Sequence, residues 1–309
     1  MNGIQVSHSR FSALLPARPG QRDSVLTTCE GKKRMESLSE LQRIEIELLL
    51  EAVFRHYGYD FRNYAFTTMS RRILERVGAE NRQTISGLTE KLLHDPACLR
   101  RLLWDLSVGT TSVFREPNFY RAFSKHAIPV LRTFPFLRVW HAGCSSGEEV
   151  YSTAILLKEH GLYDRARIYA TDFNEAVVDQ ARSGTFRQES IEEYCKNYEA
   201  AGRSGAFNDY YIVKNGYAVF DPSLKKNVTF AQHNLVTDGS FMEFNAIFCR
   251  YVMIYFDRKL RASVHELIYK SLSRLGILCL GKKESLHLTP HEPEYKELVP
   301  EEKIYQKSR

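Results

Sequence analysis

One stretch decides the predicted fold: residues 139–149, with the sequence VWHAGCSSGEE. The apolar residues Phe136–Ala142 predict a buried strand, and Gly143–Gly147 predicts a tight turn. Glu148–His160 then predicts a helix. A strand, a turn of small residues and a helix, in this order, form the first unit of an α/β sheet.

Further apolar runs after this unit predict more strands. Arg167–Asp172 predicts a second strand, and Glu175–Arg182 predicts the helix that follows it. The other candidate strands are Val228–His233, Ala246–Cys249 and Ile277–Leu280. Strands that alternate with helices indicate a mostly parallel sheet covered on both faces. In such sheets, ligands bind at the carboxyl ends of the strands, where the strand order reverses.

The residues before Phe136 show helical patterns and no strand signal. Ser39 is a candidate N-cap for the first helix. The apolar residues of this helix recur at three- and four-residue spacing and are Leu41, Ile44, Leu48 and Leu49. The other predicted helices are Ser70–Val77, Ile85–Leu93 and Cys98–Leu106. We therefore expect a helical domain with its linker at 37–125 and an α/β domain at 126–309.

Residues 1–36 are polar and contain several prolines and glycines. They predict a disordered leader, or a start codon assigned too far upstream. They lack the apolar centre of a signal peptide, and the chain has no apolar run of the roughly 18–20 residues that a membrane span needs. We therefore expect a cytoplasmic protein without direct membrane insertion.

Charge and cysteine content exclude several kinds of site. The net charge of +6 is mild, and no basic tail or block indicates a nucleic acid partner. None of the six cysteines forms a C-x-x-C pair, and no histidine cluster has metal-ligand spacing. We therefore expect neither a disulfide framework nor a metal site.

The turn after the first strand favours a cationic ligand. It has neither the G-x-G-x-x-G spacing of a dinucleotide site nor the G-K-[ST] of a P-loop. Glu148 and Glu149 would repel a pyrophosphate, whereas S-adenosylmethionine carries a sulfonium and an ammonium group. Asp172 ends the second strand, where it could accept hydrogen bonds from ribose hydroxyls or cap the next helix. Together these residues favour a nucleoside without phosphates.

Six segments in a fixed order resemble the chemoreceptor glutamate methyltransferase family, CheR. They are 111–117 (TSVFREP), 140–152 (WHAGCSSGEEVYS), 170–174 (ATDFN), 233–235 (HNL), 248–256 (FCRYVMIYF) and 280–285 (LGKKES). The resemblance covers about residues 38–307. It implies an N-terminal helical domain and a Rossmann-like sheet that binds S-adenosylmethionine, with a small antiparallel β insertion at about 194–221.

The activity implied by the resemblance is protein-glutamate O-methylation. The substrates would be glutamate side chains on the cytoplasmic helices of methyl-accepting chemotaxis receptors, and the cofactor product would be S-adenosylhomocysteine. A glutamate carboxylate is already ionised at neutral pH, so it can attack the sulfonium methyl group without a base. Catalysis then consists of positioning and desolvation.

The resemblance also implies roles for individual residues. Glu148 would hold the amino group of the cofactor, Asp172 would hold its ribose, and Asn234 and Leu235 would flank the adenine. The full implied set of cofactor-binding residues is Gly109, Thr111, Arg115, Gly143, Glu148, Asp172, Asn234, Leu235, Tyr251 and Val252. Arg115 and Tyr255 are the predicted catalytic residues. Arg115 would pair either with the cofactor carboxylate or with the substrate carboxylate.

A cluster of arginines in the helical domain is a candidate receptor-docking surface, because the family meets glutamate-rich receptor helices there. Its members are Arg62, Arg71, Arg72 and Arg76. The alternative is that they form an ordinary solvated face. In the insertion, Tyr210, Tyr211 and Tyr217 predict either the core of the small sheet or an edge that adds a receptor tail peptide.

Two positions depart from the family pattern. The family usually has Asn at Tyr251 and often at Gly109. A phenol is larger than a carboxamide and offers different hydrogen bonds, so the Tyr251 ring could stack on adenine or block the pocket. Two other functions therefore stay open: a degraded, CheR-like binding or sensor module that no longer holds cofactor, and a methyltransferase for another substrate.

Overall fold

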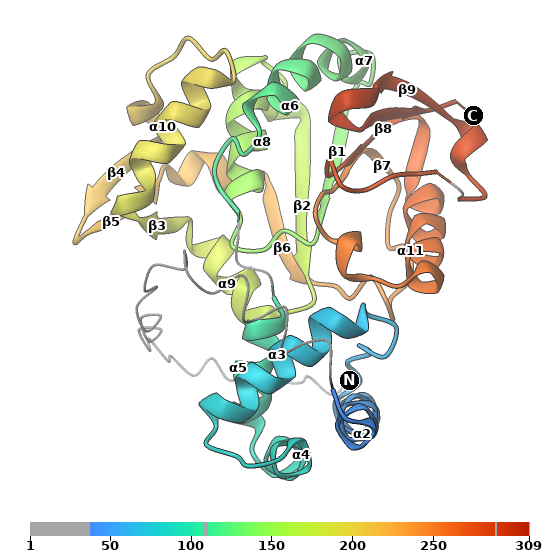
Figure 1. Ribbon diagram of the computed structural model, residues 1–309. Coiled ribbons are helices and arrows are strands. Elements are labelled where there is room, and N and C mark those ends of the chain that lie inside the picture. The colour runs from blue at the N-terminus through green and yellow to red at the C-terminus, as the bar shows by residue number, and fades with distance from the viewer. Residues whose placement is uncertain (1–37, 108–110, 288, 309) are drawn as a thin grey trace, which may run out of the picture. The chain divides into compact units, whose positions relative to one another are not determined.

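Four helices lie within residues 40–106, in the N-terminal part of the chain that the structure describes. The fold is described from a computed structural model, which covers residues 38–107, 111–287 and 289–308 (Figure 1). The helices are α2 (Glu40–Tyr57), α3 (Phe66–Ala79), α4 (Ile85–His94) and α5 (Pro96–Leu106). The predicted leader and Gly109 lie outside the described residues. Residues 41–309 form one unit, so these helices and the sheet are described together.

Side-chain caps fix where two of these helices begin. Thr84 accepts a hydrogen bond from the Gly87 N–H at 3.0 Å and starts α4. Asp95 accepts one from the Ala97 N–H at 2.9 Å and starts α5, with Pro96 in the first turn. Both caps satisfy backbone donors that have no partner inside the helix.

The buried face of α2 includes few of the apolar residues that predicted this helix. Leu41, Ile44 and Leu48 are 66%, 48% and 61% exposed. The buried residues are Ile46, Leu49, Leu50 and Val53. This helix carries two apolar stripes, both at helical spacing, and only the surrounding structure decides which one is buried. The helix predicted from this spacing is present, and of the four residues that predicted it only Leu49 is buried.

A seven-stranded sheet follows, with the order β6-β2-β1-β7-β8-β10-β9. Its strands are β1 (Leu137–Ala142), β2 (Ala166–Asp172), β6 (Val228–Gln232), β7 (Phe244–Cys249), β8 (Leu272–Leu280), β9 (Tyr295–Val299) and β10 (Ile304–Lys307). The pairs from β6 to β8 are parallel, and β10 pairs antiparallel with β8 and β9. The chain leaves β1 toward β2 and later returns to β7 on its other side. The strand order therefore reverses between β1 and β7, where a ligand site is expected.

Helices cover both faces of this sheet (Figure 1). The chain contributes α6 (Pro117–Ala122), α7 (Ile128–Leu131), α8 (Glu148–Glu159), α9 (Glu175–Ser183) and α11 (Arg258–Ser271). Val139 on β1 packs in one buried cluster with Ile155 of α8, and Trp140 packs in the other with Val264 of α11. Successive residues of a strand point to opposite faces, so β1 supplies both cores.

A second, three-stranded antiparallel sheet has the order β3-β5-β4. Its strands are β3 (Thr185–Arg187), β4 (Tyr211–Lys214) and β5 (Tyr217–Phe220), and α10 (Ile191–Ala200) lies between β3 and β4 in the chain (Figure 1). The sheet begins at Thr185, before the predicted 194–221, because Thr185 pairs with Val219. Tyr217 is 49% exposed, so the expectation that it belongs to the core was wrong.

None of the helices in the described ranges combines the length and apolarity that a membrane crossing requires.

Candidate active site

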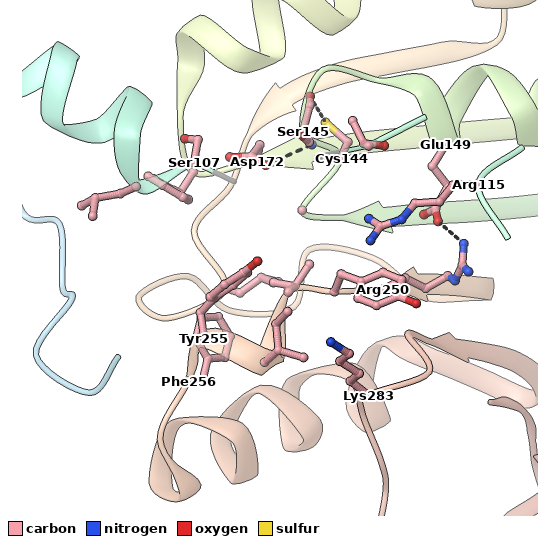
Figure 2. A pocket seen from close by; sticks show the side chains of 18 of the residues that line it. Ser107, Arg115, Cys144, Ser145, Glu149, Asp172, Arg250, Tyr255, Phe256 and Lys283 are labelled. Atoms are coloured by element: carbon pink, nitrogen blue, oxygen red, sulfur yellow. Dashed lines mark hydrogen bonds and ion pairs between the residues drawn. The ribbon is translucent and has the colours of Figure 1, made fainter. Parts of the chain in front are cut away.

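A cavity of about 560 Å³ opens at the carboxyl end of the parallel strands. Its volume falls within the range of roughly 300–1,000 Å³ that is typical of small-molecule sites. The predicted site residues that line it are Thr111, Arg115, Gly143, Asp172, Asn234, Leu235, Tyr251, Val252 and Tyr255. The structure thus brings together residues that are separated by up to 144 positions in the chain. Figure 2 shows the cavity with several of these side chains.

Gly143 is required where the turn after β1 approaches the loop after β7. Its φ is +82°, and a Cβ atom there would lie 2.6 Å from Val252 Cγ2. The N–H groups of Gly143 and Cys144 both donate to the Thr171 carbonyl at 2.8 Å. Only glycine adopts this backbone without strain and leaves space for Val252.

Asp172 is 8% exposed and holds the turn after β1. Its Oδ2 accepts a hydrogen bond from the Ser145 N–H at 3.1 Å (Figure 2). Its Oδ1 accepts one from the Asn174 N–H at 3.1 Å. Burial raises the pKa of Asp172 above its usual value. The N-cap of α9 is Asn174, which accepts from the Ala176 N–H, so Asp172 does not serve as that cap. Each carboxylate oxygen keeps lone pairs for the hydroxyls of a ribose.

The two glutamates at the start of α8 have different surroundings. Glu148 is not among the residues that line the cavity; its Oε2 accepts a hydrogen bond from the Ser146 hydroxyl at 2.7 Å, and burial raises its pKa. Glu149 does line the cavity. Neighbouring residues of a helix point about 100° apart. Glu149 is therefore the one of the pair that faces this cavity, and the cofactor contact predicted for Glu148 stays a prediction.

Arg250 joins two carboxylates from distant parts of the chain. Its side chain is 2% exposed, and its Nη1 and Nη2 donate to Glu149 Oε2 at 2.7 Å and to Glu116 Oε2 at 2.6 Å (Figure 2). Its Cζ also lies 3.8 Å from the centre of the Phe119 ring. Burial acts to raise the pKa of Glu149, but Arg250 and a hydrogen bond with His141 outweigh this and lower it to about 2. Two carboxylates against one guanidinium leave this group with a net negative charge, which suits a cation.

A buried carboxylate shapes the other wall of the cavity. Glu284 is 5% exposed and accepts hydrogen bonds from four backbone N–H groups, those of Tyr251, Val252, Met253 and Gly281, at 2.7–2.9 Å. Burial raises the pKa of Glu284, and the four donors act against that rise. This carboxylate thereby fixes the backbone of the loop that follows β7.

Two contacts hold the side chain of Tyr251, one at its hydroxyl and one at the face of its ring. Its hydroxyl donates to Glu116, and the Cζ atom of Arg115 lies 4.1 Å from the centre of its ring. Burial and the bond with Glu116 raise its pKa to about 12, so the phenol stays protonated at neutral pH. The ring is therefore in contact with the guanidinium of Arg115 while it also lines the cavity, and both placements considered from the sequence stay predictions.

Tyr255, the second predicted catalytic residue, follows in the same loop. Burial raises its pKa, while the nearby positive charges of Arg72 and Arg115 act in the opposite direction. Its backbone carbonyl accepts a hydrogen bond from the Ala65 N–H at 2.7 Å. This hydrogen bond connects the loop after β7, which lines the cavity, to the segment before α3 of the helical domain.

The comparisons with known proteins identify the family. Residues 44–107 match the CheR methyltransferase all-alpha domain, and residues 109–303 match the CheR methyltransferase SAM binding domain. This chain belongs to the CheR methyltransferase family. Its cofactor is S-adenosylmethionine, and the negative charge of the Glu116–Glu149–Arg250 group and the available lone pairs of Asp172 fit a cationic nucleoside.

Several CheR relatives share most of this chain. A Pseudomonas putida protein named as a methyltransferase, Cher3, is 43% identical over 86% of this chain and 97% of its own. A chemotaxis protein methyltransferase of Listeria monocytogenes is 30% identical over 76% of this chain and 87% of its own. Chemotaxis protein methyltransferase 2 of Pseudomonas aeruginosa is 33% identical over 60% of this chain and 66% of its own.

The four arginines proposed for docking differ in how far they are engaged within this CheR protein. Arg62 pairs with Glu51 and Asp60, and Arg72 donates to the Asp105 carbonyl. Arg76 donates from Nε to Asp105 at 2.7 Å and from Nη1 to Glu80 at 3.1 Å, and its side chain is 13% exposed. Arg71 pairs with Glu75 at 3.3 Å and is 48% exposed. Of the four, Arg71 is therefore the most accessible to a partner.

Glu80 is the centre of the ionic network that holds Arg76. Its side chain is 5% exposed and contacts Arg76, Lys91 and Arg101 at 2.6–3.1 Å. The hydrogen bonds from Arg101 are the largest cause that lowers its pKa, to about 2. A carboxylate with a depressed pKa stabilises the fold above its unfolded-state pKa, and this contribution is lost as the pH falls toward the folded-state value.

We expect Glu80→Gln to lower the free energy of unfolding by on the order of 2–3 kcal/mol near pH 7. The loss should shrink as the pH falls from about 4.5 toward about 2, since the wild type also becomes neutral there. Urea unfolding followed by circular dichroism measures the difference, with Glu75→Gln at the exposed Arg71 pair as the control. A loss that stayed constant over this pH range would contradict the role of the ionised carboxylate.

Proposed function

We propose that this protein transfers the methyl group of S-adenosylmethionine to glutamate side chains of methyl-accepting chemotaxis receptors. The observation that carries the proposal is the charge arrangement of one cavity. Glu149 and Asp172 line it and suit the cationic donor, while Arg115 and Lys283 line it too and suit an anionic acceptor. The relatives named chemotaxis protein methyltransferases support a chemotaxis receptor as the protein substrate.

The proposed reaction needs little acid–base chemistry. Bound S-adenosylmethionine supplies the methyl group: a new O–CH₃ bond forms as the S–CH₃ bond breaks, and the electron pair stays on sulfur. An acceptor glutamate with a pKa of about 4.3 already carries the negative charge that this attack requires. The protein contributes orientation and removal of water, which together can account for a large part of the acceleration.

The residues of the site divide this work. Asp172 holds the nucleoside, and the Glu116–Glu149–Arg250 group balances the positive charge of the donor. Arg115 directs the acceptor carboxylate toward the methyl group, because a guanidinium binds a carboxylate through two parallel N–H donors. Tyr255 also lines the cavity and closes the space around the acceptor carboxylate. Burial raises the pKa of its phenol, which stays protonated.

Receptor docking would use the exposed part of the helical domain. Arg71 of α3 is the best placed of the four candidate arginines to meet glutamate-rich helices. Acceptor glutamates of this kind lie on the cytoplasmic side of a receptor, so we propose that the protein acts in the cytoplasm.

Methyl transfer from tritium-labelled S-adenosylmethionine to a receptor cytoplasmic fragment tests the proposal. We expect label on the fragment that is released as volatile methanol by base, because carboxyl methyl esters hydrolyse under these conditions and methylated amines do not. Label that resisted base would contradict esterification. Cofactor binding without any transfer would favour a binding or sensor module.

A further inference from the structure

The backbone of Tyr251 is held in a conformation that it would not adopt alone. Its φ is +61°, in the left-handed region, which is unfavourable for a residue with a side chain. The Glu284 carboxylate compensates by binding the N–H groups of Tyr251 and of the two residues after it at 2.7–2.9 Å. A Cβ atom at Gly281 would lie 2.8 Å from both the Tyr251 nitrogen and Glu284 Oε2. The hydrogen bonds to Glu284 and the close packing at Gly281 therefore determine the direction in which the Tyr251 side chain leaves the loop.

The hydroxyl at the tip of the Tyr251 ring is also held in place. Its hydroxyl donates to Glu116 Oε1, and the second oxygen of that carboxylate accepts from Arg250 at 2.6 Å. Because Arg250 is buried and also bound to Glu149, Glu116 has little freedom to follow a moving ring. The aromatic face of Tyr251 is thus a rigid surface at the cavity wall.

Arg115 rests on this surface. Its Cζ lies 4.1 Å from the ring centre, within the range of a cation–π contact. The linker on either side is also constrained: Phe114 and Glu116 have φ values of +51° and +60°, and the Phe114 N–H donates to the Ser152 hydroxyl at 2.8 Å. The backbone of the linker and the ring of Tyr251 both constrain the position of the Arg115 guanidinium, which lies in the cavity (Figure 2).

We propose that Tyr251 is a positioning residue that acts through Arg115, holding its guanidinium where it meets the acceptor carboxylate. The identity of that carboxylate rests on the proposed function; the positioning does not. An asparagine, usual in the family at this position, offers no aromatic face, so this chain positions its arginine by a different contact.

A double-mutant cycle tests the proposal. Tyr251→Leu and Tyr251→Phe are made in the wild type and in Arg115→Ala, with Phe136→Leu, an exposed aromatic residue just before β1, as the matched control. We expect Tyr251→Leu to lower kcat/KM about tenfold, the size of one lost cation–π contact. Tyr251→Phe keeps the aromatic face and loses only the bond with Glu116, so we expect it to lower kcat/KM less than Tyr251→Leu does. Binding of S-adenosylhomocysteine should change by less than about threefold in both. In the Arg115→Ala background, Tyr251→Leu should cause no further loss.

Independent, multiplicative losses for Tyr251→Leu and Arg115→Ala would overturn the proposal. So would a loss in cofactor binding as large as the loss in kcat/KM, since the ring would then act on the nucleoside.

A spectroscopic measurement separates this proposal from the proposed function. Nitrogen-15 spectra of arginine side chains show each Nε–H group, and Arg115→Lys assigns the one from Arg115. In the wild type and in Tyr251→Phe, the ring should shift this proton upfield, and in Tyr251→Leu the shift should disappear. If no receptor fragment is methylated but this pattern is seen, the positioning stands and the acceptor is wrong. An Arg115 signal that is the same in all three proteins would overturn the positioning.

Discussion

Arg115→Ala should lower the turnover of methyl transfer about a hundredfold or more at saturating receptor. The reason is that Arg115 lines the cavity and, in the proposed reaction, contacts the carboxylate as it attacks; removal of one such preorganised donor typically costs about 10²–10³ in kcat. Initial rates with labelled cofactor over a range of receptor-fragment concentrations measure the effect.

The matched control is Arg71→Ala, which removes an exposed arginine of α3. A lost docking contact raises KM, so more receptor fragment should restore the wild-type rate. The same recovery in Arg115→Ala would contradict its placement at the reacting carboxylate.

Asp172→Ala should weaken binding of S-adenosylhomocysteine by about 1.5–3 kcal/mol, the usual cost of losing a charged hydrogen-bond partner. The variant also leaves the N–H groups of Ser145 and Asn174 without their acceptor, so the turn after β1 loses support. Isothermal titration calorimetry measures the affinity, and Asp179→Ala, which removes an exposed carboxylate of α9, is the control. An unchanged affinity in Asp172→Ala would remove this residue from the cofactor site.

The central part of the fold could be predicted from the sequence because its strands are buried. Apolar runs such as Arg167–Asp172 and Ala246–Cys249 lie in or next to β2 and β7, since a parallel sheet covered on both faces demands continuous apolar residues. The two antiparallel strands at one end of the sheet, β9 and β10, were missed. Tyr295–Val299 and Ile304–Lys307 are short and mix charged and apolar residues, so they show no clear strand pattern.

The members of the candidate site were mostly predictable, but their orientations were not. Asp172 and Gly143 follow buried strands, so their place at one edge of the sheet follows from the strand pattern alone. Whether Glu148 or Glu149 faces the cavity depends on the exact start of α8 and on Arg250, which lies 101 residues after Glu149. Glu116 and Arg250 were both within the quoted family segments, yet the sequence offered no signal that they pair.

The orientation of the Tyr251 side chain was even less predictable from the sequence. Its side-chain direction depends on a left-handed backbone that Glu284 stabilises from 33 residues farther along the chain. No local pattern predicts such a contact. Likewise, Arg71 and Arg76 are equivalent in the sequence, and only the packing of α3 against α5 shows that Arg76 is engaged by Asp105.

Mass spectrometry of a receptor cytoplasmic fragment after incubation with the protein and S-adenosylmethionine tests the central claim most directly. The account predicts the mass of one added methyl group per modified site, located by fragmentation on glutamate side chains. It also predicts that, at an early time point matched to the wild type, these signals are about a hundredfold weaker when Arg115→Ala replaces it. Methyl groups on lysine, arginine or backbone nitrogen, or an unmodified fragment despite measured cofactor binding, would contradict it.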